Sequence, residues 1–367
     1  MTPASGASRA LARVDLGAIA DNVRRLQDVA GVPVCAVVKA DAYGHGAVPV
    51  ARAAQAAGAA WLAVSTAREA AQLRAAGLEG RILVMGALAP EEAQVALAAQ
   101  ADVVVWHAAL LELPFPHVHV KLDTGMGRFG TRDAAHATAL ARRLAQEGRL
   151  AGLMTHFATA DDREDPFFDQ QLERFTAWVD GLRPELADDL VVHAANSAAT
   201  LREPGARFDL VRPGVALYGL DPFGVDPDEH GLRPALELTS WVATVKRCRA
   251  GESAGYGRRF VAQRDTVVAT VPIGYGDGWR RALTNNGEVL VRGRRVPIAG
   301  TVSMDAITLD LGPEGGARVG DEVVLIGTRD GERVDAEEVA RRLGTINYEV
   351  TCGLLPRVPR RHVEGAA

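Results

Sequence analysis

The sequence predicts an α/β protein in which an N-terminal (β/α)8 TIM barrel is followed by a C-terminal, mainly-β domain. From residue 33 to about residue 217, short apolar runs alternate with Ala-, Arg- and Glu-rich stretches, which is the pattern of repeated βα units. From about Pro234 onward, apolar and polar residues alternate between glycine-rich turns, and this period of two indicates strands with one buried face.

The apolar runs of the first part have the length of buried parallel strands, and eight such strands with intervening helices close into a barrel. The predicted strands begin at residues 33, 60, 81, 102, 117, 151, 190 and 208, with the sequences PVCAVV, AWLAV, RILVMG, DVVVW, HVHVKL, AGLMTHF, LVVHAA and FDLVRPG.

The stretches between these runs have the composition of helices. Residues 66–77 begin on Thr66, a residue type that is preferred as an N-cap, and they end at a glycine, as do residues 132–148. A further helix is predicted over residues 15–31, before the first barrel strand.

The C-terminal third is predicted to be a separate β domain. Its alternating segments are residues 236–248, 266–274, 287–311 and 321–327, and one helix is predicted at residues 335–344. We therefore assign residues 10–234 to a barrel and residues 235–367 to a β domain, and we expect residues 1–9 to pack against the β domain.

The composition of the 367-residue chain, with 48% hydrophobic and 24% charged residues, is that of an ordinary globular protein. A net charge of −5 without long runs of either sign predicts no nucleic-acid or membrane partner. The three cysteines have no metal-like spacing, which favours a reducing compartment, and no signal-peptide core or long apolar segment is found. We expect a cytoplasmic protein that acts on small molecules.

Lys39 stands at the end of the first predicted strand, in the stretch VPVCAVVKADAYGHG. The C-terminal ends of barrel strands face the active site in this architecture, so polar residues there carry more functional weight than polar residues elsewhere. A lone lysine at such an end can also be solvated or held in an ion pair, so neighbouring strand ends have to be considered with it.

Two later strand ends predict a phosphate site. Asn196 and Ser197 follow the seventh strand, with Ser197 able to act as cap and phosphate donor, and Arg212 and Gly214 follow the eighth. The recurrent phosphate site of barrels is made by these two loops. A phosphate and an amine on one rim indicate pyridoxal phosphate, whose aldehyde forms a Schiff base with lysine. Taken alone, Asn196 and Ser197 could equally be a plain helix cap.

Nine segments of the chain resemble the alanine racemase family, in that family's order and at compatible spacing. They are AVVKADAYGHG, KLDTGMGRFG, MTHFATAD, ANSAAT, VRPGVALYG, AGYGRRF, PIGYGDGW, AGTVSMDAITLD and NYEVTCGLLPRVPR. The resemblance covers nearly the whole chain. It implies a pyridoxal phosphate-dependent isomerase that interconverts L- and D-alanine, supplies D-alanine for peptidoglycan, and works as a homodimer with shared active sites.

The resemblance implies two acid/base groups. Lys39 would hold the cofactor and act as the base on the D-alanine face, and Tyr256 would act on the L-alanine face. Racemisation needs this arrangement, because a proton that leaves one side of Cα must return from the other side. A phenol keeps its proton at neutral pH, so a neighbour such as His156 is a candidate to assist Tyr256. The alternative for Tyr256 is an ordinary surface-loop aromatic residue.

Three basic residues also receive roles from the resemblance. Arg212 would face the pyridine nitrogen and donate a hydrogen bond without protonating it, because arginine keeps its protons. Arg128 would bind the substrate carboxylate and steady the cofactor's phenolic oxygen. Lys121 corresponds to a lysine that many members carry as a carbamate, which could hold Arg128. The alternatives are a rim salt bridge for Arg212, a solvated Arg128, and an unmodified Lys121 paired with Asp123.

The other matched positions surround the phosphate, the ring and the substrate. They are Tyr43, Ser197, Gly214 and Tyr348 for the phosphate, His156 and Asn196 near the ring, and Tyr275, Met304 and Asp305 for the substrate-carboxylate pocket and its entrance. The sequence departs from the family pattern at Ser303, where a cysteine is usual, and at Gly276, where an alanine is common. Neither departure removes a catalytic group.

Three other functions are compatible with parts of the sequence. A related decarboxylase of ornithine or diaminopimelate would need a glycine-rich phosphate loop and a cysteine-bearing acidic motif, and neither is found. A non-catalytic cofactor carrier built on a lone barrel would not need residues 236–360. A racemase of broader specificity, for example for serine, stays open, although Tyr275 and Tyr348 favour a methyl-sized pocket. No metal site is predicted.

Overall fold

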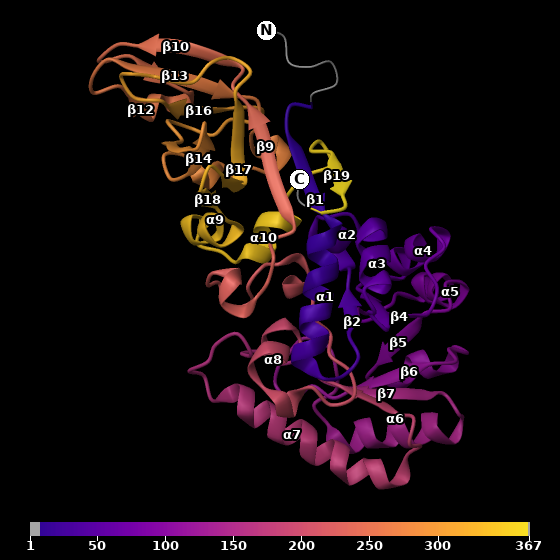
Figure 1. The fold of residues 1–367 in the computed structure, drawn as a ribbon. Coiled ribbons are helices and arrows are strands. Elements are labelled where there is room, and N and C mark those ends of the chain that lie inside the picture. Colours follow the sequence, from indigo (N-terminus) through magenta and orange to yellow (C-terminus); the bar gives the residue numbers. More distant parts are fainter. Residues whose placement is uncertain (1–7, 366–367) are drawn as a thin grey trace. The chain divides into compact units, whose positions relative to one another are not determined.

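The computed structural model describes residues 8–365 of the chain (Figure 1). These residues form two compact units, one made of residues 17–233 and the other of residues 8–16 together with residues 234–365. Each unit is described by itself below. Within the described range, no helix combines the length and the apolar character that crossing a bilayer requires.

The first unit, called the barrel unit here, is a curled parallel sheet with helices on its outside (Figure 1). Its seven strands pair in chain order: β2 (Cys35–Val37), β3 (Trp61–Val64), β4 (Arg81–Val84), β5 (Asp102–Val105), β6 (Val118–Lys121), β7 (Leu150–Met154) and β8 (Val191–His193). Its α-helices are α1 (Leu16–Ala30), α3 (Ala47–Ala56), α4 (Ala67–Ala75), α5 (Pro90–Ala98), α6 (Ala134–Gln146), α7 (Phe167–Leu182) and α8 (Ser197–Arg202), and the short segment labelled α2 (Lys39–Tyr43) is a left-handed turn.

The predicted eighth strand, FDLVRPG, is reduced to a single bridge between Val211 and Val34. Backbone bonds nevertheless join this segment to both edges of the sheet, from Asp209 N to Val192 O at 3.0 Å and from Cys35 N to Val211 O at 2.8 Å. Pro213 has no N–H with which to extend a ladder, which limits the strand. The predicted barrel architecture is confirmed, with seven regular strands and this closing segment.

The predicted helices over residues 15–31, 66–77 and 132–148 are confirmed as α1, α4 and α6. Thr66 caps α4 as expected, because its hydroxyl accepts from the N–H of Glu69 at 3.2 Å while the Glu69 carboxylate accepts from the N–H of Thr66 at 3.0 Å. Asp133 caps α6 by accepting from two backbone N–H groups.

The second unit, called the β unit here, is mainly β, as predicted. Its main sheet has the order β15-β14-β17-β9-β1-β19, with β18 paired to β17, and two smaller sheets are β10-β13-β16 and β11-β12. The strands are β1 (Leu11–Asp15), β9 (Leu236–Trp241), β10 (Thr244–Cys248), β11 (Ser253–Ala254), β12 (Phe260–Val261), β13 (Thr266–Val271), β14 (Glu288–Val291), β15 (Arg294–Pro297), β16 (Ile307–Asp310), β17 (Glu322–Arg329), β18 (Glu332–Val334) and β19 (Arg360–Val363).

Strand β1 corrects the predicted domain boundary. It pairs antiparallel with β9 and parallel with β19, so residues 10–16 belong with the β unit rather than with the barrel. Ala12 and Val14 are buried while their neighbours are half-buried, which is the alternation of a strand with one face on a core. Of residues 1–9, which were expected to pack on the β domain, residues 1–7 lie outside the described range, and Arg9 contacts Asp305 of the β unit.

The β unit holds one helix that was predicted and one that was not. The predicted helix is α9 (Ala336–Leu343), which Asp335 caps, and the other is α10 (Asn347–Cys352). A six-residue helix spans fewer than two turns, too few for a helical period to show in the sequence.

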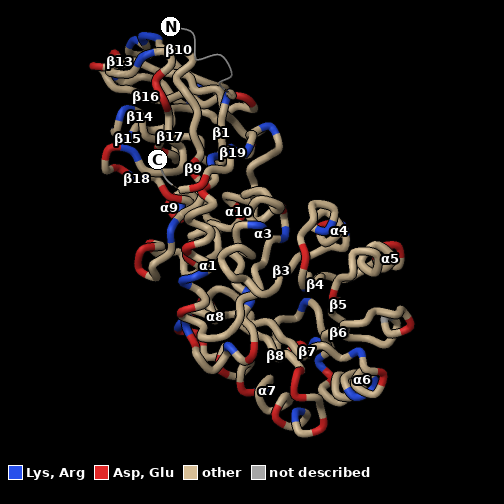
Figure 2. Tube along the Cα trace, turned by 45° about the vertical axis from the view of Figure 1, so that its right-hand side comes forward, with Lys and Arg blue, Asp and Glu red and all other residues tan. Residues whose placement is uncertain are grey.

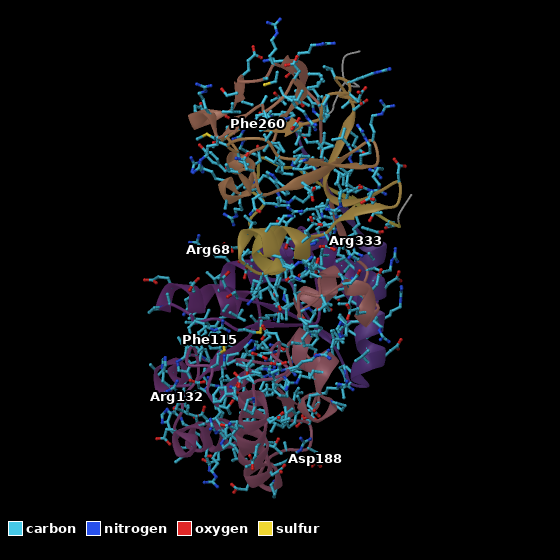
Figure 3. All side chains as sticks on the ribbon, turned by 90° about the vertical axis from the view of Figure 1, so that its left-hand side faces the viewer. Arg68, Phe115, Arg132, Asp188, Phe260 and Arg333 are labelled. Carbon is cyan, nitrogen blue, oxygen red and sulfur yellow. The ribbon has the colours of Figure 1, made fainter. Side chains whose placement is uncertain are left out.

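Each unit has its own apolar interior, and Figure 3 shows the side chains that fill it. Phe115 is among the largest fully buried side chains of the barrel unit. In the β unit, the half-buried Phe260 packs against a small cluster of Cys248, Ala262 and Val268. Figure 2 shows acidic and basic residues of both signs along the traces of both units.

Candidate active site

The C-terminal ends of the barrel strands bring most of the predicted residues to one rim. Because β2 to β8 run parallel, the residues that follow them lie on the same edge of the sheet. The rim residues are Lys39 after β2, Lys121 at the end of β6, His156 after β7, Asn196 and Ser197 after β8, and Arg212 and Gly214 after the closing bridge.

The backbone after Lys39 makes a left-handed turn. Ala40, Asp41, Ala42 and Tyr43 have φ values of 53°, 52°, 53° and 53°, a conformation that disfavours residues with a Cβ by roughly 1–2 kcal/mol each. The Glu69 carboxylate of α4 accepts the N–H of Ala40 at 2.7 Å, and Asp41 accepts the N–H of Ala47 at 2.7 Å. These bonds hold the turn that carries Lys39.

Tyr43, Gly214 and Ser197 pack closely at the rim. A Cβ placed on Gly214 would lie 2.4 Å from the Tyr43 hydroxyl oxygen, so only glycine leaves room for that ring. The Ser197 hydroxyl accepts from the N–H of Gly214 at 2.9 Å and of Ala216 at 3.2 Å. Asn196, not Ser197, caps α8, since its side-chain oxygen accepts from the N–H of Ala199 at 3.0 Å. Of the two residues considered as the helix cap, Asn196 is confirmed and Ser197 is not.

Arg212 is buried, and both terminal nitrogens of its guanidinium donate hydrogen bonds within the barrel unit. Its Nη1 donates to His193 Nδ1 at 2.8 Å, and its Nη2 donates to the carbonyls of Thr155 and Ala194 at 3.0 Å each. Burial lowers the pKa of Arg212 to about 10, so the guanidinium stays charged at neutral pH. The side chain makes no salt bridge within residues 8–365, and the rim salt bridge considered for it is absent there.

Lys121 is 4% exposed and lies near two other cations. Burial, followed by the charges of Arg212 and Arg128, lowers the pKa of Lys121 from 10.5 to about 7. Asp123, the alternative partner, uses its carboxylate for the N–H groups of Gly125 and Gly127 and for Arg132. Burial raises the pKa of Asp123, but these hydrogen bonds outweigh that effect and lower it. The structure thus gives Asp123 a loop-organising role.

His156 stands among the same cations. Desolvation and the charges of Arg212 and Lys121 lower the pKa of His156 well below its usual value, so this ring is neutral near pH 7. Its Nδ1 lies 3.4 Å from Arg212 Nη2. Arg128 is exposed on the loop after β6 and stacks loosely on Phe129, with its guanidinium carbon 6.0 Å from the ring centre. The rim is therefore strongly cationic, which suits anionic groups such as a phosphate or a carboxylate.

Tyr256 lies on the β unit and is 75% exposed. It stands between Gly255 and Gly257, whose φ values of 76° and 69° favour glycine. Its carbonyl accepts from the Thr301 hydroxyl at 2.6 Å, which fixes the loop while the phenol projects from the unit.

Tyr275 and Met304 lie on two adjacent loops of the β unit. The N–H of Tyr275 donates to Ser303 O at 3.0 Å, and the N–H of Gly276 donates to Met304 O at 2.8 Å. The side chains of Tyr275 and Met304 are 40% and 51% exposed. Ser303, the departure from the usual cysteine, donates its hydroxyl to Ala306 O at 2.7 Å and so closes the turn around Met304.

Asp305 is held by arginines. Arg357 donates to its carboxylate at 2.7 Å, and Arg9 lies 3.7 Å from the same oxygen. The hydrogen bond from Arg357 lowers the pKa of Asp305. Gly276, the second departure, lies under this pair, because an added Cβ would come within 2.6 Å of Arg357 Nη1. A glycine here leaves room for Arg357 beside Asp305.

Tyr348, expected at the phosphate, is a half-buried residue of α10 in the β unit. Its neighbour Asn347 donates to the buried Glu337 at 2.9 Å, which ties α10 to α9. The candidate residues thus divide between the units: Tyr256, Tyr275, Met304, Asp305 and Tyr348 lie on the β unit, and all the others lie on the barrel unit.

Sequence reasoning missed the polar residues behind Arg212. His193 links Arg212 to His119, and His119 reaches Asp102. Both histidines stand inside apolar strand segments, HVHVKL and LVVHAA, where a polar side chain must find a partner when buried. This signal was available in the sequence, but the identity of the partners was not.

Comparison with known proteins agrees with both units. Residues 14–222 match the family model described as "Alanine racemase, N-terminal domain", and residues 235–362 match "Alanine racemase, C-terminal domain". The chain is 42% identical over 371 residues to alanine racemase 1 of Bacillus subtilis, covering 97% of this chain and 93% of that protein. It is 43% identical over 365 residues to the alanine racemase of Geobacillus stearothermophilus, with 95% and 92% covered.

Solved structures give the same result. The alanine racemase from D-cycloserine-producing Streptomyces lavendulae superposes with a TM-score of 0.92 at 37% identity, covering 99% of each chain. The Bacillus anthracis enzyme with bound L-Ala-P superposes with a TM-score of 0.89 at 38% identity, covering 98% of this chain and 96% of the other. With both domains matched and relatives aligned over nearly their full length, the chain belongs to the alanine racemase family of pyridoxal phosphate-dependent isomerases.

Proposed function

We propose that this chain performs its alanine racemase reaction with Lys39 and Tyr256 as the two acid/base groups, in active sites shared between two copies of the chain. One observation supports this proposal most strongly. The two residues matched to the family's bases lie on different units, Lys39 on the rim of the barrel unit and Tyr256 on an exposed loop of the β unit. The family assignment supports the interconversion of L- and D-alanine, and the residue roles below are the proposal.

The barrel rim suits pyridoxal phosphate. Lys39 offers an amine, the hydroxyls of Tyr43 and Ser197 are placed beside Gly214, and Arg212 presents a buried cation. The close approach of Tyr43 to Gly214 leaves no space for a side chain at that position. In this assignment Lys39 would hold the cofactor through its aldehyde, and Tyr43, Ser197 and Gly214 would hold its phosphate.

When bound, the cofactor supplies an electron sink for the pair left on Cα after a proton departs. With the amine of alanine in the place of Lys39 on the cofactor, the freed Lys39 amine would take the α-proton of D-alanine, and the Tyr256 phenol would give a proton to the opposite face. The reverse transfers convert L-alanine. Arg212 would donate a hydrogen bond to the ring nitrogen and keep its own proton, and Arg128 would bind the substrate carboxylate.

Lys121 is proposed to be a carbamate. With its pKa near 7 the neutral amine is available at physiological pH, and its lone pair can attack the carbon of CO2. An N–C bond forms, one C–O bond pair moves to oxygen, and a proton leaves the nitrogen for solvent. The product is an anion beside Arg128, which it would hold for the substrate carboxylate.

The surface of the β unit supports dimerisation. The large apolar side chains exposed on it include Tyr256 at 75%, Ile346 at 59%, Met304 at 51%, Leu355 at 42% and Tyr275 at 40%. The loops of Tyr275, Met304 and Leu355 are joined by backbone bonds, including Leu355 N to Asp277 O at 3.1 Å. Exposed apolar residues on adjacent loops mark an interaction surface, and we assign it to the barrel rim of a second copy.

We also propose a reducing, cytoplasmic location and a pocket sized for alanine. Cys35 and Cys248 are buried thiols, and burial raises the pKa of Cys35 to about 12, so that thiol is inert.

Racemisation of serine or other amino acids is the second candidate activity, and steady-state rates with a panel of L-amino acids decide between a narrow and a broad pocket.

Exchange of the α-hydrogen in D2O tests the two roles. Tyr256→Phe should still exchange the α-hydrogen of D-alanine through Lys39, yet form almost no L-alanine, because the opposite proton donor is gone. The control Val261→Ala changes an exposed residue of β12 that has no assigned role and should racemise normally. If Tyr256→Phe racemises at the wild-type rate, Tyr256 is not the second base.

A further inference from the structure

A row of buried polar side chains crosses the interior of the barrel behind Arg212. Asp102, His119, His193 and Arg212 are 2%, 0%, 0% and 3% exposed, in a place that barrels normally fill with branched apolar residues. The links are Arg212 Nη1 to His193 Nδ1 at 2.8 Å, His193 Nε2 to His119 Nδ1 at 2.9 Å, and His119 Nε2 to Asp102 Oδ2 at 3.5 Å. Arg81 Nε donates to the same Asp102 oxygen at 2.8 Å.

The direction of every hydrogen bond in this row follows from its two ends. Arginine has only donors, so Nδ1 of His193 must accept from Arg212 and cannot carry a proton. A neutral His193 then carries its proton on Nε2 and donates to His119 Nδ1. His119 in turn carries its proton on Nε2 and donates toward Asp102, whose carboxylate only accepts. One tautomer of each ring satisfies the whole row.

Both rings are neutral in this arrangement. Burial, then the charges of Arg212 and His119, lower the pKa of His193 well below its usual value. Burial also lowers the pKa of His119, although Asp102 opposes this effect. The other charged or titratable groups that act on these rings are Arg81 and Lys121. A protonated His193 would have a donor on Nδ1 that faces the donor of Arg212, so geometry and charge agree.

The sheet makes room for this row at a single glycine. Gly152 of β7 is the register partner of His119 on β6, and a Cβ placed on it would lie 2.3 Å from His119 Nδ1 and 2.6 Å from Val191 O. Trp61 of β3 packs edge-on against His119, with ring centres 5.7 Å apart. The Trp61 ring also lies 6.5 Å from the His193 ring and carries the Arg81 guanidinium at 4.1 Å, so Trp61 packs against the row through its ring face and edge.

We propose that Asp102 and His119 are positioning residues, which fix the tautomer of His193 and thereby hold Arg212 in the orientation that presents it to the cofactor ring. This inference deepens the proposed function and rests on it, because it takes Arg212 as the group that faces the ring nitrogen. Without His119, His193 is free to place its proton on Nδ1, where it would oppose the Arg212 donor.

The tautomers are measured directly by 15N NMR of histidine-labelled wild-type holoenzyme. Both rings should be neutral, with the proton on Nε2 and a bare Nδ1, and the bare Nδ1 of His119 should couple through the hydrogen bond to the Nε2 proton of His193. A proton on Nδ1 of either ring, or an imidazolium at neutral pH, would overturn the proposal whatever the role of Arg212 turns out to be.

A matched set of variants tests the effect on Arg212. His119→Phe keeps a ring but removes the acceptor for His193, whereas His119→Asn places an amide oxygen near the position of Nδ1 and should restore it. Trp61→Phe is the packing control. We expect His119→Phe to lower kcat by on the order of 10-fold, as loss of a supporting hydrogen-bond partner does, with little change in KM and a shifted cofactor absorption band. His119→Asn and Trp61→Phe should stay close to wild type.

The outcomes separate the inference from the function it rests on. If His119→Phe and Trp61→Phe behave alike, the row is ordinary packing and the inference is wrong. If His119→Phe fails to fold, Gly152→Ala is measured in its place, because the added Cβ displaces the His119 ring. Its kcat and its cofactor absorption band should change in the same way. Arg212→Lys, measured in parallel, should shift the absorption band. An unshifted band in that variant would refute the role of Arg212 itself.

Discussion

Lys121 is the residue whose chemistry the structure makes most testable. It is buried beside Arg128 and Arg212, and Asp123 is engaged elsewhere. A permanent cation at this place would repel both arginines, whereas a carbamate would attract them. The state of one nitrogen therefore decides whether Arg128 is held for the substrate.

We predict that removal of CO2 raises KM for alanine and that bicarbonate reverses the effect. Lys121→Met, which keeps the side-chain length, should raise KM by about 10-fold or more, the loss expected for one hydrogen bond to a charged group, roughly 1.5–3 kcal/mol. It should no longer respond to bicarbonate. The mass of the native protein checks the modification. If KM of the wild type is insensitive to CO2, Lys121 acts as an unmodified amine.

The pH dependence of stability follows from the same residue. In CO2-free buffer the pKa of Lys121 is about 7 in the folded protein against 10.5 ordinarily, so between these values the unfolded chain binds a proton that the folded chain does not. Stability must then rise with pH across this window. We expect the excess thermal stability of Lys121→Met over wild type to be greatest at and below about pH 7 and to fade toward pH 10.5. A pH-independent difference would contradict the lowered pKa.

At this scale the sequence predicted which residues lie on the rim, but not their hydrogen-bond partners. Lys39, Ser197 and Arg212 were indicated by their places after apolar strands, because parallel strands align their ends. His119, Asp102 and Glu69 were missed, since each acts on a rim residue that is distant in sequence, and the link exists only after the strands and helices pack. The sequence left the cap of α8 open between Asn196 and Ser197, because Asn and Ser are both good N-caps.

Among the elements, the left-handed turn at residues 40–43 is the one most directly tied to the chemistry. It carries four consecutive non-glycine residues at positive φ, and the bond from Ala40 N–H to Glu69 holds its first residue. This turn fixes the backbone from which Lys39 leaves.

Replacing Ala40 by glycine should therefore not lower the thermal stability, unlike most Ala→Gly changes. Ala40 is exposed, so no packing is lost, and relief of about 1 kcal/mol of left-handed strain offsets the flexibility that glycine adds to the unfolded chain. We expect an unchanged or higher thermal midpoint of the holoenzyme. The matched control is Ala139→Gly in the middle of the right-handed α6, at an exposed position, which should cost about 1 kcal/mol. Equal losses in both variants would contradict the left-handed turn.

Element prediction succeeded where hydrophobic period and capping residues agreed. The helices α1, α4, α6 and α9 and the seven barrel strands follow from such patterns. The closing segment at residues 208–213 was read as a full strand because its apolar run resembles one, but Pro213 and Gly214 shorten it. Residues 10–16 were included in the barrel and their strand β1 was not predicted, since a five-residue strand next to a predicted helix carries no sign of which sheet it joins.

At the scale of the whole molecule, we propose that one catalytic site needs residues from two chains. The barrel unit holds Lys39, Arg212 and Lys121, and the β unit carries the exposed Tyr256 and Met304. A surface of this kind is expected to be covered in the working assembly, and a two-fold dimer would create two equivalent sites.

The most direct test mixes Lys39→Ala with Tyr256→Ala, each nearly inactive alone, under conditions that allow subunits to exchange. In a mixed dimer with shared sites, one site carries both changes and the other carries neither. Random mixing makes half of the dimers mixed, so about a quarter of the wild-type activity should return. A tag on one variant verifies the exchange. Exchange without any recovered activity would show that Lys39 and Tyr256 of each site come from the same chain, and would contradict the account.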